Sequence, residues 1–325
     1  MIRQGNLIGR LNMARLELRA RYWSVLDFLS RNIGKSDPAI IRIIDGAPPS
    51  ASLKGLCLFA HYDRDGILDD HVVHYLEQLH GLGYEIILIS TSENLRDDSI
   101  TSALPFCRSI IVRENVGFDF SSWKVGFDFV GTLSTYDRLV LANDSVYGPV
   151  RDLRDVFARM ESRNLDLWGI TDSYEFRYHL QSYFLVFSKT TFESRPFQRF
   201  WSKLPYHKFK ISLVRECEIG LSERLLKAGF HLGALCEYAR IKSEHPRLVT
   251  QAEKISDVNK PANSSLALWR LLVEDYGCPF LKVMLLRDNP LGDKTLSSWP
   301  AVLEGAGDYD IGLIHLHVNR IASPR

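Results

Sequence analysis

Residues 55–90 read GLCLFAHYDRDGILDDHVVHYLEQLHGLGYEIILIS, and this stretch decides the fold class. It opens on an apolar run at 55–60 and closes on a second at 84–90, and each run has the length of a buried strand. Between them a helix is predicted to start at Asp69 and Asp70 and to end at Gly83, with an apolar face made of Val72, Val73, Leu76, Leu79 and Leu82. A strand, a helix and a strand in this order form a βαβ unit with parallel strands.

The same rhythm continues along the chain. Further apolar runs lie at 108–112, 137–142 and 165–170, about every 25 to 30 residues, and helical patterns fill most of the gaps. The sequence therefore predicts an α/β fold of Rossmann type, with a mostly parallel sheet flanked by helices. Ligands of such sheets bind beyond the carboxyl ends of the strands, so the residues after each apolar run are the ones to consider.

Segments at both ends of the chain are predicted to differ from this body. Residues 1–52 are expected to hold an amphipathic helix over 7–29 and a connector with one short strand, residues 53–240 the main domain, and residues 241–325 a helical C-terminal extension. The first helix is flanked by arginines, so it can lie on an anionic membrane surface, or pack on its own domain or on a second subunit. The role of residues 292–325 stays unassigned.

Composition limits the classes of partner. A net charge of +1 with 24% charged residues gives no field for a polyanion, so no nucleic-acid partner is expected. The five cysteines are scattered without metal-ligand spacing and are interpreted as reduced core residues. No apolar run approaches the roughly 20 residues that span a bilayer. We therefore expect a cytoplasmic protein, with the first helix as its one candidate for peripheral contact with the membrane.

Polar segments follow the predicted strands: HYDRDG after the first, TSENL after the second, RENVGFDF after the third and NDSVYGP after the fourth. No GxGxxG motif follows the first strand and no GxxxxGK[ST] motif occurs, which argues against a dinucleotide fold and a P-loop NTPase. Four polar tips at one edge of one sheet indicate a ligand site.

Several unusual strings resemble a known family: FAHYDRDG, RENVGFDFSSWKVGF, LANDSVYGP, WGITDS, HLQSYFLVFSK and WRLLVEDYGCPFLKVMLLRDNP. From about residue 54 to about residue 291 the chain resembles the rhamnan synthesis protein F family, glycosyltransferases of bacterial surface polysaccharide assembly. It is more distantly similar to the nucleotide-binding half of GT-A glycosyltransferases. The resemblance implies a GT-A-like fold and a nucleotide-sugar donor.

In GT-A enzymes a DxD-like acidic tip holds a metal ion on the donor diphosphate, and the corresponding residues here are Asn143, Asp144 and Ser145. One carboxylate is present where two are usual. Asn143 and Asp144 could still hold Mg²⁺ or Mn²⁺, because hard cations accept amide oxygens too. A metal-free version would use Arg113, Lys124 or another cation. The structural alternative for the tip is an Asx-turn.

The remaining donor contacts come from the other tips. The resemblance places Arg113 and Asn115 on the nucleotide or its phosphates, and Gly117 would let the backbone pass close to the ligand. Asp119 either binds a sugar hydroxyl or caps the following helix. The residues expected around the base and its pentose are His61, Tyr62, Asp63 and Thr91, together with Ser92.

Inverting transfer needs a carboxylate that takes the proton of the acceptor hydroxyl. The resemblance favours Glu218, expected at the start of a helix, where it is either the base or an ordinary first-turn acid. Glu216 and Asp172 are the rivals. His179 and Gln181 are expected to line the acceptor side.

These expectations combine into one function. The chain is predicted to transfer a deoxyhexose with inversion, and the resemblance implies L-rhamnose from dTDP-L-rhamnose, onto a lipid-linked glycan such as a growing O-antigen or rhamnan. The alternatives are a transferase with another nucleotide sugar, and a non-catalytic scaffold of a polysaccharide assembly complex. The basic first helix would bring the enzyme to the inner face of the plasma membrane or form a homodimer.

Overall fold

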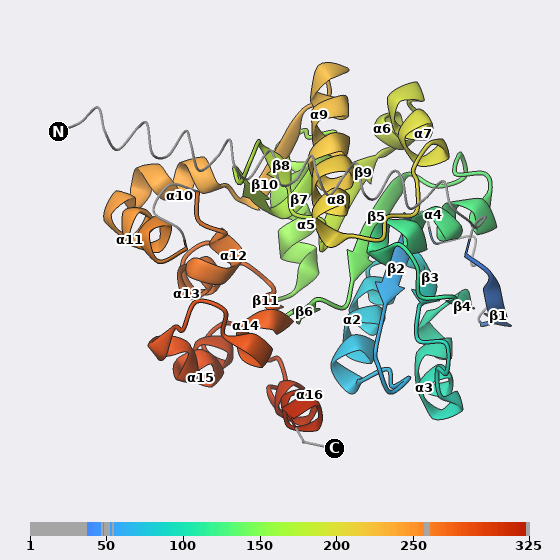
Figure 1. Cartoon of the computed structure of the whole chain (residues 1–325), viewed down its shortest axis with the longest axis horizontal. Helices are drawn as coiled ribbons and strands as arrows, with labels where there is room; N and C mark the ends of the chain where they lie inside the picture. Colours follow the sequence, from blue (N-terminus) through green and yellow to red (C-terminus); the bar gives the residue numbers. More distant parts are fainter. Residues whose placement is uncertain (1–37, 47, 49–52, 54, 257–260, 323–325) are drawn as a thin grey trace.

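A computed structural model describes residues 38–46, 48, 53, 55–256 and 261–322 (Figure 1). The helix predicted over 7–29 lies outside these residues. Within them, no helix is long and apolar enough to cross a membrane.

The main sheet has nine strands, in the order β1-β4-β3-β2-β5-β9-β7-β10, with β8 paired to β7. Four neighbours are parallel: β4 (Ser109–Arg113), β3 (Tyr84–Ser90), β2 (Gly55–His61) and β5 (Arg138–Asn143). All residues of β2 and β3 are buried, as expected for parallel strands covered on both faces. The α/β prediction and its first four strands are confirmed.

The other half of the sheet is mixed. β9 (Phe184–Ser188) is antiparallel to both β5 and β7 (Leu167–Ser173), and β10 (Leu232–Cys236) is parallel to β7. The segment HLQSYFLVFSK, at 179–189, holds two strands, β8 (His179–Leu180) and β9. The short strand expected in the connector is β1 (Ile40–Asp45), an antiparallel edge strand on β4.

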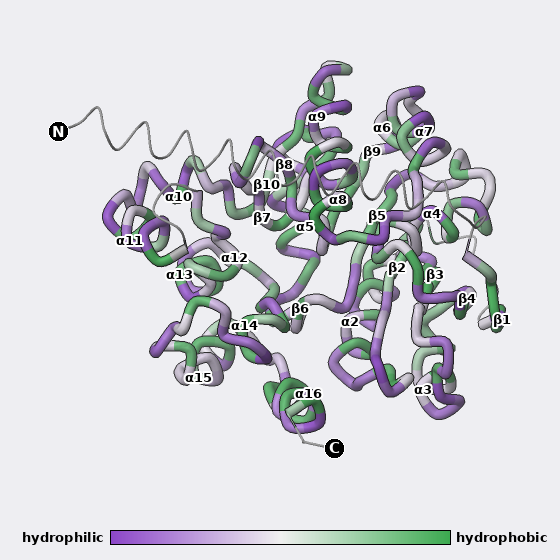
Figure 2. Tube along the Cα trace, in the orientation of Figure 1, coloured by the Kyte–Doolittle hydropathy of each residue, from purple (hydrophilic) through white to green (hydrophobic). Residues whose placement is uncertain are grey.

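Side chains of the strands alternate between two apolar cores. In β2, Cys57 and Phe59 face the core that includes α2 (Asp70–Gly81) and α5 (Leu153–Glu161). Leu56, Leu58 and Ala60 face the other core, which includes α4 (Phe118–Val130), α7 (Arg195–Ser202) and α9 (Gly220–Lys227). In Figure 2, hydrophobic segments lie toward the centre of the sheet, and many hydrophilic segments lie on the outer turns of the helices. This is the two-sided layering of an α/β sheet.

Shorter elements connect these layers. They are α3 (Asp97–Ala103), η1 (Leu104–Phe106), α6 (Lys189–Phe192), α8 (Lys210–Leu213), η2 (Val214–Ile219), α10 (Tyr238–Glu244) and α11 (Pro246–Ser256). The C-terminal segment adds α12 (Ser264–Ala267), α13 (Trp269–Glu274), α14 (Val283–Asp288), η3 (Lys294–Ser298), α15 (Trp299–Glu304) and α16 (Gly312–Ala322).

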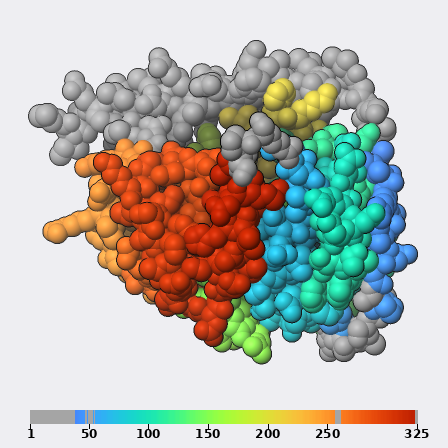
Figure 3. All heavy atoms as spheres, turned by 90° about the horizontal axis from the view of Figure 1, so that it is seen from below, coloured from blue at the N-terminus to red at the C-terminus, as the bar shows by residue number. Residues whose placement is uncertain are grey.

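The C-terminal segment packs on the sheet body. Seen from below, it lies beside the α2 region, and α16 contacts α2 (Figure 3). A two-stranded ribbon joins the two parts: β11 (Leu281–Lys282) pairs antiparallel with β6 (Val146–Tyr147), directly after the tip of β5. The chain thereby returns to the edge of the sheet where the strand tips lie.

Candidate active site

The tip of β5 is built around an Asx-turn. The Asn143 Oδ1 accepts hydrogen bonds from the Ser145 amide at 3.1 Å and the Ser145 hydroxyl at 2.6 Å. The Asn143 Nδ2 donates to Asp119 Oδ2 at 2.9 Å, so the tip is tied to the first turn of α4. Asn143 is buried, and all three of these contacts are internal. The local geometry of this tip is therefore that of the Asx-turn, the structural alternative to a metal site.

Asp144 projects from the same tip toward the end of β2. Its Oδ2 accepts from the Tyr62 amide at 2.7 Å and lies 4.0 Å from His61 Nε2. Burial raises the pKa of Asp144 to about 8, aided by the nearby carboxylates of Asp119 and Asp63 and opposed by the Tyr62 amide. The His61 imidazole is itself buried, which lowers its pKa to about 4. It is hydrogen-bonded to the Ser90 hydroxyl at 2.9 Å, so it offers Asp144 no positive charge near neutral pH.

The loop that leaves β4 is held by Arg113 from the inside. The guanidinium of this fully buried residue donates to the carbonyls of Glu114, Val116 and Phe118 and to the Ser122 hydroxyl. Burial lowers the pKa of Arg113 to about 10. Arg113 therefore stabilises the loop from within, because its guanidinium donates mainly to backbone carbonyls of the loop.

The backbone of the same loop requires a glycine at position 117. Its φ is +83°, and a Cβ there would lie 2.0 Å from Ser121 Oγ. Asn115 is exposed beside it. Asp119 makes no cap hydrogen bond to α4, since the N-cap residue is Gly117 without a side-chain bond. Its carboxylate instead turns to Asn143, and burial raises its pKa.

Other predicted donor residues have their polar atoms engaged within the protein. The Asp63 carboxylate accepts from the amides of Asp65 and Ile67 and from Arg320. Thr91 Oγ1 donates to the His61 carbonyl. Tyr62, in contrast, is 52% exposed at the end of β2, so its ring is accessible to a ligand.

Glu218 lies in the middle of a helix, which corrects the expectation that it stands at a helix start. α8, η2 and α9 follow one another without a break from Lys210 to Lys227, and Glu218 is eight residues after Lys210. The helix dipole acts mainly on the first turn, so it does not keep this carboxylate ionised. Instead burial raises the pKa of Glu218 to about 7, opposed by Lys282 and a hydrogen bond from Ser182.

The helix around Glu218 is irregular. η2 is a π-helical turn, and such turns often occur at functional sites. Glu218 Oε2 lies 3.9 Å from His179 Nε2, whose Nδ1 is bonded to the Arg177 carbonyl at 2.8 Å. Burial lowers the pKa of His179. The structure thus brings His179 and Glu218 close together.

The rival carboxylates lie in other surroundings. Asp172 Oδ1 accepts from the Tyr238 amide at 2.7 Å, and burial raises its pKa to about 6 with a contribution from Glu237. Glu216 lies 3.8 Å from His207. Gln181 is bonded to Thr171 and Asn263. Lys282 lowers the pKa of Glu218 and Asp119 raises it, beside the larger effect of burial.

Lys282 was missed as a site residue from the sequence. The ribbon of β6 and β11 pairs it with Val146, and its Nζ lies 3.4 Å from Ser145 Oγ. It also lies 3.9 Å from the centroid of the Tyr183 ring. The available signal was a single lysine in the apolar run CPFLKVMLL, at 278–286. That pattern shows burial of the lysine but not its neighbours.

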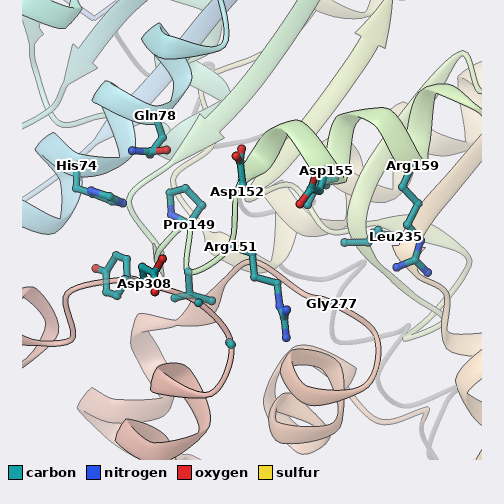
Figure 4. Close-up of a pocket in the computed structure, with 15 residues that line it drawn as sticks. His74, Gln78, Pro149, Arg151, Asp152, Asp155, Arg159, Leu235, Gly277 and Asp308 are labelled. Atoms are coloured by element: carbon teal, nitrogen blue, oxygen red, sulfur yellow. The ribbon is translucent and has the colours of Figure 1, made fainter.

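A separate cavity of about 520 Å³ opens between α2, the start of α5 and the loop at 306–309 (Figure 4). His74 and Gln78 line it from α2, and Arg151, Asp152 and Asp308 line it from the other segments. None of the predicted site residues lines this cavity. We place the candidate active site at the strand tips because Lys282 and Asp119 both act on the pKa of Glu218 there, and Asp119 also raises the pKa of Asp144.

Comparison with known proteins adds a family. The model of the family described as rhamnan synthesis protein F matches residues 86–325. The uncharacterized protein y4gN of Sinorhizobium fredii is 27% identical over 198 residues, 59% of this chain and 51% of that protein. This chain thus spans about half the length of that relative. Virulence protein VirA of Vibrio anguillarum is 26% identical over 273 residues, 79% of this chain and 87% of VirA.

Solved structures overlap with the chain more loosely. The mannosyltransferase PcManGT of Pyrobaculum calidifontis, in complex with GDP-Man and Mn²⁺, is 11% identical with a TM-score of 0.34, covering 95% of this chain and 90% of its own. The mannosyltransferase Ktr4p of S. cerevisiae, in complex with GDP, is 13% identical with a TM-score of 0.34, covering 69% and 78%.

Proposed function

The chain belongs to the rhamnan synthesis protein F family, and on that premise we propose that it is an inverting glycosyltransferase that uses a nucleotide sugar in polysaccharide synthesis. The observation that carries this proposal is Glu218, a largely buried carboxylate 3.9 Å from His179, with its pKa raised to about 7 in the electrostatic field of Lys282 and Asp119. A general base with a pKa near the working pH is what proton transfer from a hydroxyl requires.

The proposed reaction is one displacement. The acceptor hydroxyl attacks the anomeric carbon while the bond from that carbon to the diphosphate oxygen breaks. Glu218 takes the hydroxyl proton, and the nucleoside diphosphate leaves with the bonding electron pair. His179, 3.9 Å from Glu218, would position the carboxylate and line the acceptor side. The exposed Tyr62 and Asn115, at the tips of β2 and β4, would contact the nucleotide.

The family supplies the proposed donor and acceptor. L-rhamnose from dTDP-L-rhamnose follows from the family's connection with rhamnan, and the lipid-linked glycan acceptor follows from the same source. The contact of residues 7–29 with the membrane or a second subunit stays a prediction, as does the placement of the protein in the cytoplasm.

A donor panel tests the proposal. The melting temperature of the purified protein is measured with dTDP, UDP, GDP, CDP and CMP in turn. The nucleotide sugar that corresponds to each binding nucleotide is then assayed for release of that nucleotide. A ligand of the native state raises the melting temperature by mass action. We expect a shift with dTDP and slow release of dTDP from dTDP-L-rhamnose. A shift with UDP or GDP alone would retain the transferase and change the sugar.

A scaffold remains the second candidate, because the tip of β5 has one carboxylate and an asparagine whose amide is bonded internally. It predicts nucleotide binding without any release from the sugar donor. Failure of every nucleotide to bind would contradict the transferase.

A further inference from the structure

The metal site expected at the tip of β5 does not fit the residues there. Asn143 Oδ1 already accepts two hydrogen bonds from Ser145, which occupy both of its lone pairs, and its Nδ2 points to Asp119. Asp144 would then be the sole protein ligand of the pair. Across the described ranges, no group of three histidine, cysteine, aspartate or glutamate side chains could hold a metal ion. The tip is thus poorly suited to the role that Asn143 and Asp144 were expected to share.

A lysine occupies the neighbourhood of this tip instead. The Val283 amide donates to the Ser145 carbonyl at 3.0 Å, so the ribbon is hydrogen-bonded directly to the tip. This register places the Lys282 Nζ 3.4 Å from Ser145 Oγ and 3.9 Å from the Tyr183 ring centroid. The backbone ladder fixes the main chain of Lys282, and the face of the Tyr183 ring attracts its ammonium group. The position of this ammonium group is therefore better defined than that of a lysine on the open surface.

The cations that the sequence suggested for a metal-free site are engaged elsewhere. Arg113 is bonded to its own loop, and Lys124 Nζ donates to the Leu204 carbonyl at 2.9 Å. Lys210 is exposed at the start of α8, where its charge also acts on Asp119 and Glu218. Lys282 is the cation held against the strand tip itself.

We propose that the Lys282 ammonium binds the donor diphosphate and neutralises its charge as it leaves, in the role that a divalent cation on Asn143 and Asp144 was expected to fill. This inference rests on the proposed function, since it names the cation of the same site. A compact lysine charge suits phosphate oxygens. When the bond from the anomeric carbon to oxygen breaks, the electron pair stays on the diphosphate, and a fixed positive charge stabilises it there.

The test measures diphosphate binding by isothermal titration calorimetry, in EDTA and again with Mn²⁺. The probes are dTDP, UDP, GDP and inorganic pyrophosphate. The variants are Lys282→Met, which removes the charge at similar length, and Lys282→Arg, which keeps a charge. Lys254→Gln, on an exposed position of α11, is the matched control. Thermal unfolding of each variant verifies that it is folded.

We expect the wild type and Lys254→Gln to bind one nucleoside diphosphate and pyrophosphate in EDTA. Lys282→Met should lose roughly tenfold or more, the loss expected for one charge-assisted contact. Lys282→Arg should recover part of that loss. If Lys282→Met failed to fold, the EDTA titration of the wild type and the arginine variant would still decide the matter.

Failure of the inference and failure of the proposed function give different results. Nucleoside diphosphate binding that requires Mn²⁺ and is unchanged in Lys282→Met would leave the transferase and remove the role of Lys282. If no nucleoside diphosphate binds under either condition, the proposed function fails, and pyrophosphate alone decides the anion site. Pyrophosphate binding lost in Lys282→Met would support it, and absence of pyrophosphate binding would refute it.

Discussion

At the scale of single residues, Glu218 is distinguished by its environment rather than by its position on a helix. It lies within η2, near His179, and its ionisation depends on Lys282 and Asp119. Glu216 is two residues away in the same π-helical turn but lies near His207. Substituting Glu216 or Glu218 therefore compares two residues of the same type in the same element that differ in their surroundings.

Glu218→Gln should lower the rate of nucleotide-sugar turnover by about 10²- to 10⁴-fold, the usual contribution of a general base. Nucleoside diphosphate binding should be nearly unchanged, because the amide has the size of the carboxyl group. Turnover is measured with the donor that the panel identifies. Glu216→Gln is the control and should keep most of the activity; the reverse result would assign the base to Glu216.

The pH dependence of kcat/KM should follow the ionisation of the free enzyme's base. Burial raises the pKa of Glu218 to about 7. The carboxylate form takes the proton, so activity should rise with pH through about 7 and fall tenfold per unit below it. Lys282→Met should move this limb upward, because Lys282 lowers the pKa of Glu218. A limb that remains near pH 4 would show that the carboxylate is not buried in solution.

We expect Asp172 to affect the free energy of unfolding rather than catalysis. Burial raises its pKa to about 6. Between about pH 4 and 6 the folded state binds more protons than the unfolded state, so this group's stabilisation is lost as pH rises through that window. Asp172→Asn keeps an acceptor for the Tyr238 amide. The variant should gain stability over the wild type by up to about 1.4 kcal/mol per pH unit there.

Urea unfolding of both proteins at several values of pH measures this difference. Asp152→Asn is the contrasting variant, since hydrogen bonds from Arg154 lower the pKa of Asp152 and its removal should give no such gain. Turnover by Asp172→Asn should be retained. Loss of turnover with normal stability would return Asp172 to the candidate bases.

At the scale of elements, the start of α4 fixes the loop after β4. Gly117 has φ +83° and Phe118 has φ +59°, so the chain enters the helix through two left-handed residues. Arg113 closes the loop from within by bonding to the carbonyls around this turn. The helix thereby presents Asp119 to the tip of β5.

Gly117→Ala should lower the free energy of unfolding through two effects. A left-handed alanine costs roughly 1–2 kcal/mol. The new Cβ would also lie 2.7 Å from the Ser121 Cβ, which no rotation of the serine side chain relieves, and this adds about 1–3 kcal/mol. Gly83→Ala, just after α2, isolates the first effect, because its φ of +88° is close to that of Gly117 and a Cβ there would have no atom within 4 Å. Equal losses in the two variants would contradict the close contact.

At the scale of the whole molecule, the C-terminal segment contributes a residue to the candidate site and is held against the sheet body. It supplies Lys282 through the ribbon, and α16 is anchored to the loop between β2 and α2 by Arg320. Arg320 is half-buried and contacts Asp63 at 2.6 Å, with Asp69 as a second partner. The two anchors hold the segment against the sheet at separate points.

Arg320→Met should lower the free energy of unfolding by about 3 kcal/mol, because it leaves partly buried carboxylates without a counter-charge. Urea unfolding measures the loss, and limited proteolysis should cut near α16 sooner than in the wild type. Arg154→Met removes an exposed pair with Asp152 and should leave stability nearly unchanged. Equal effects of the two variants would show that α16 is not anchored through Arg320.

Much of this architecture was readable from the sequence. The apolar runs at 55–60 and 84–90 predicted β2 and β3, because strands buried on both faces are mostly apolar. Their order with the intervening helix predicted parallel pairing, and polar residues after the runs predicted where a ligand site would lie. These are local patterns, set by burial and by the periods of helices and strands.

Tertiary structure decided the rest, because it depends on neighbours far away in the chain. Arg113 was a candidate phosphate ligand, and only packing shows that its hydrogen bonds go to its own loop. The helix of Glu218 begins at Lys210, so burial sets its pKa rather than the dipole. Lys282 reaches Ser145 across 137 positions of sequence through a two-residue ribbon. Periodicity carries no information about such pairings, and the cation of the candidate site is therefore a property of the fold.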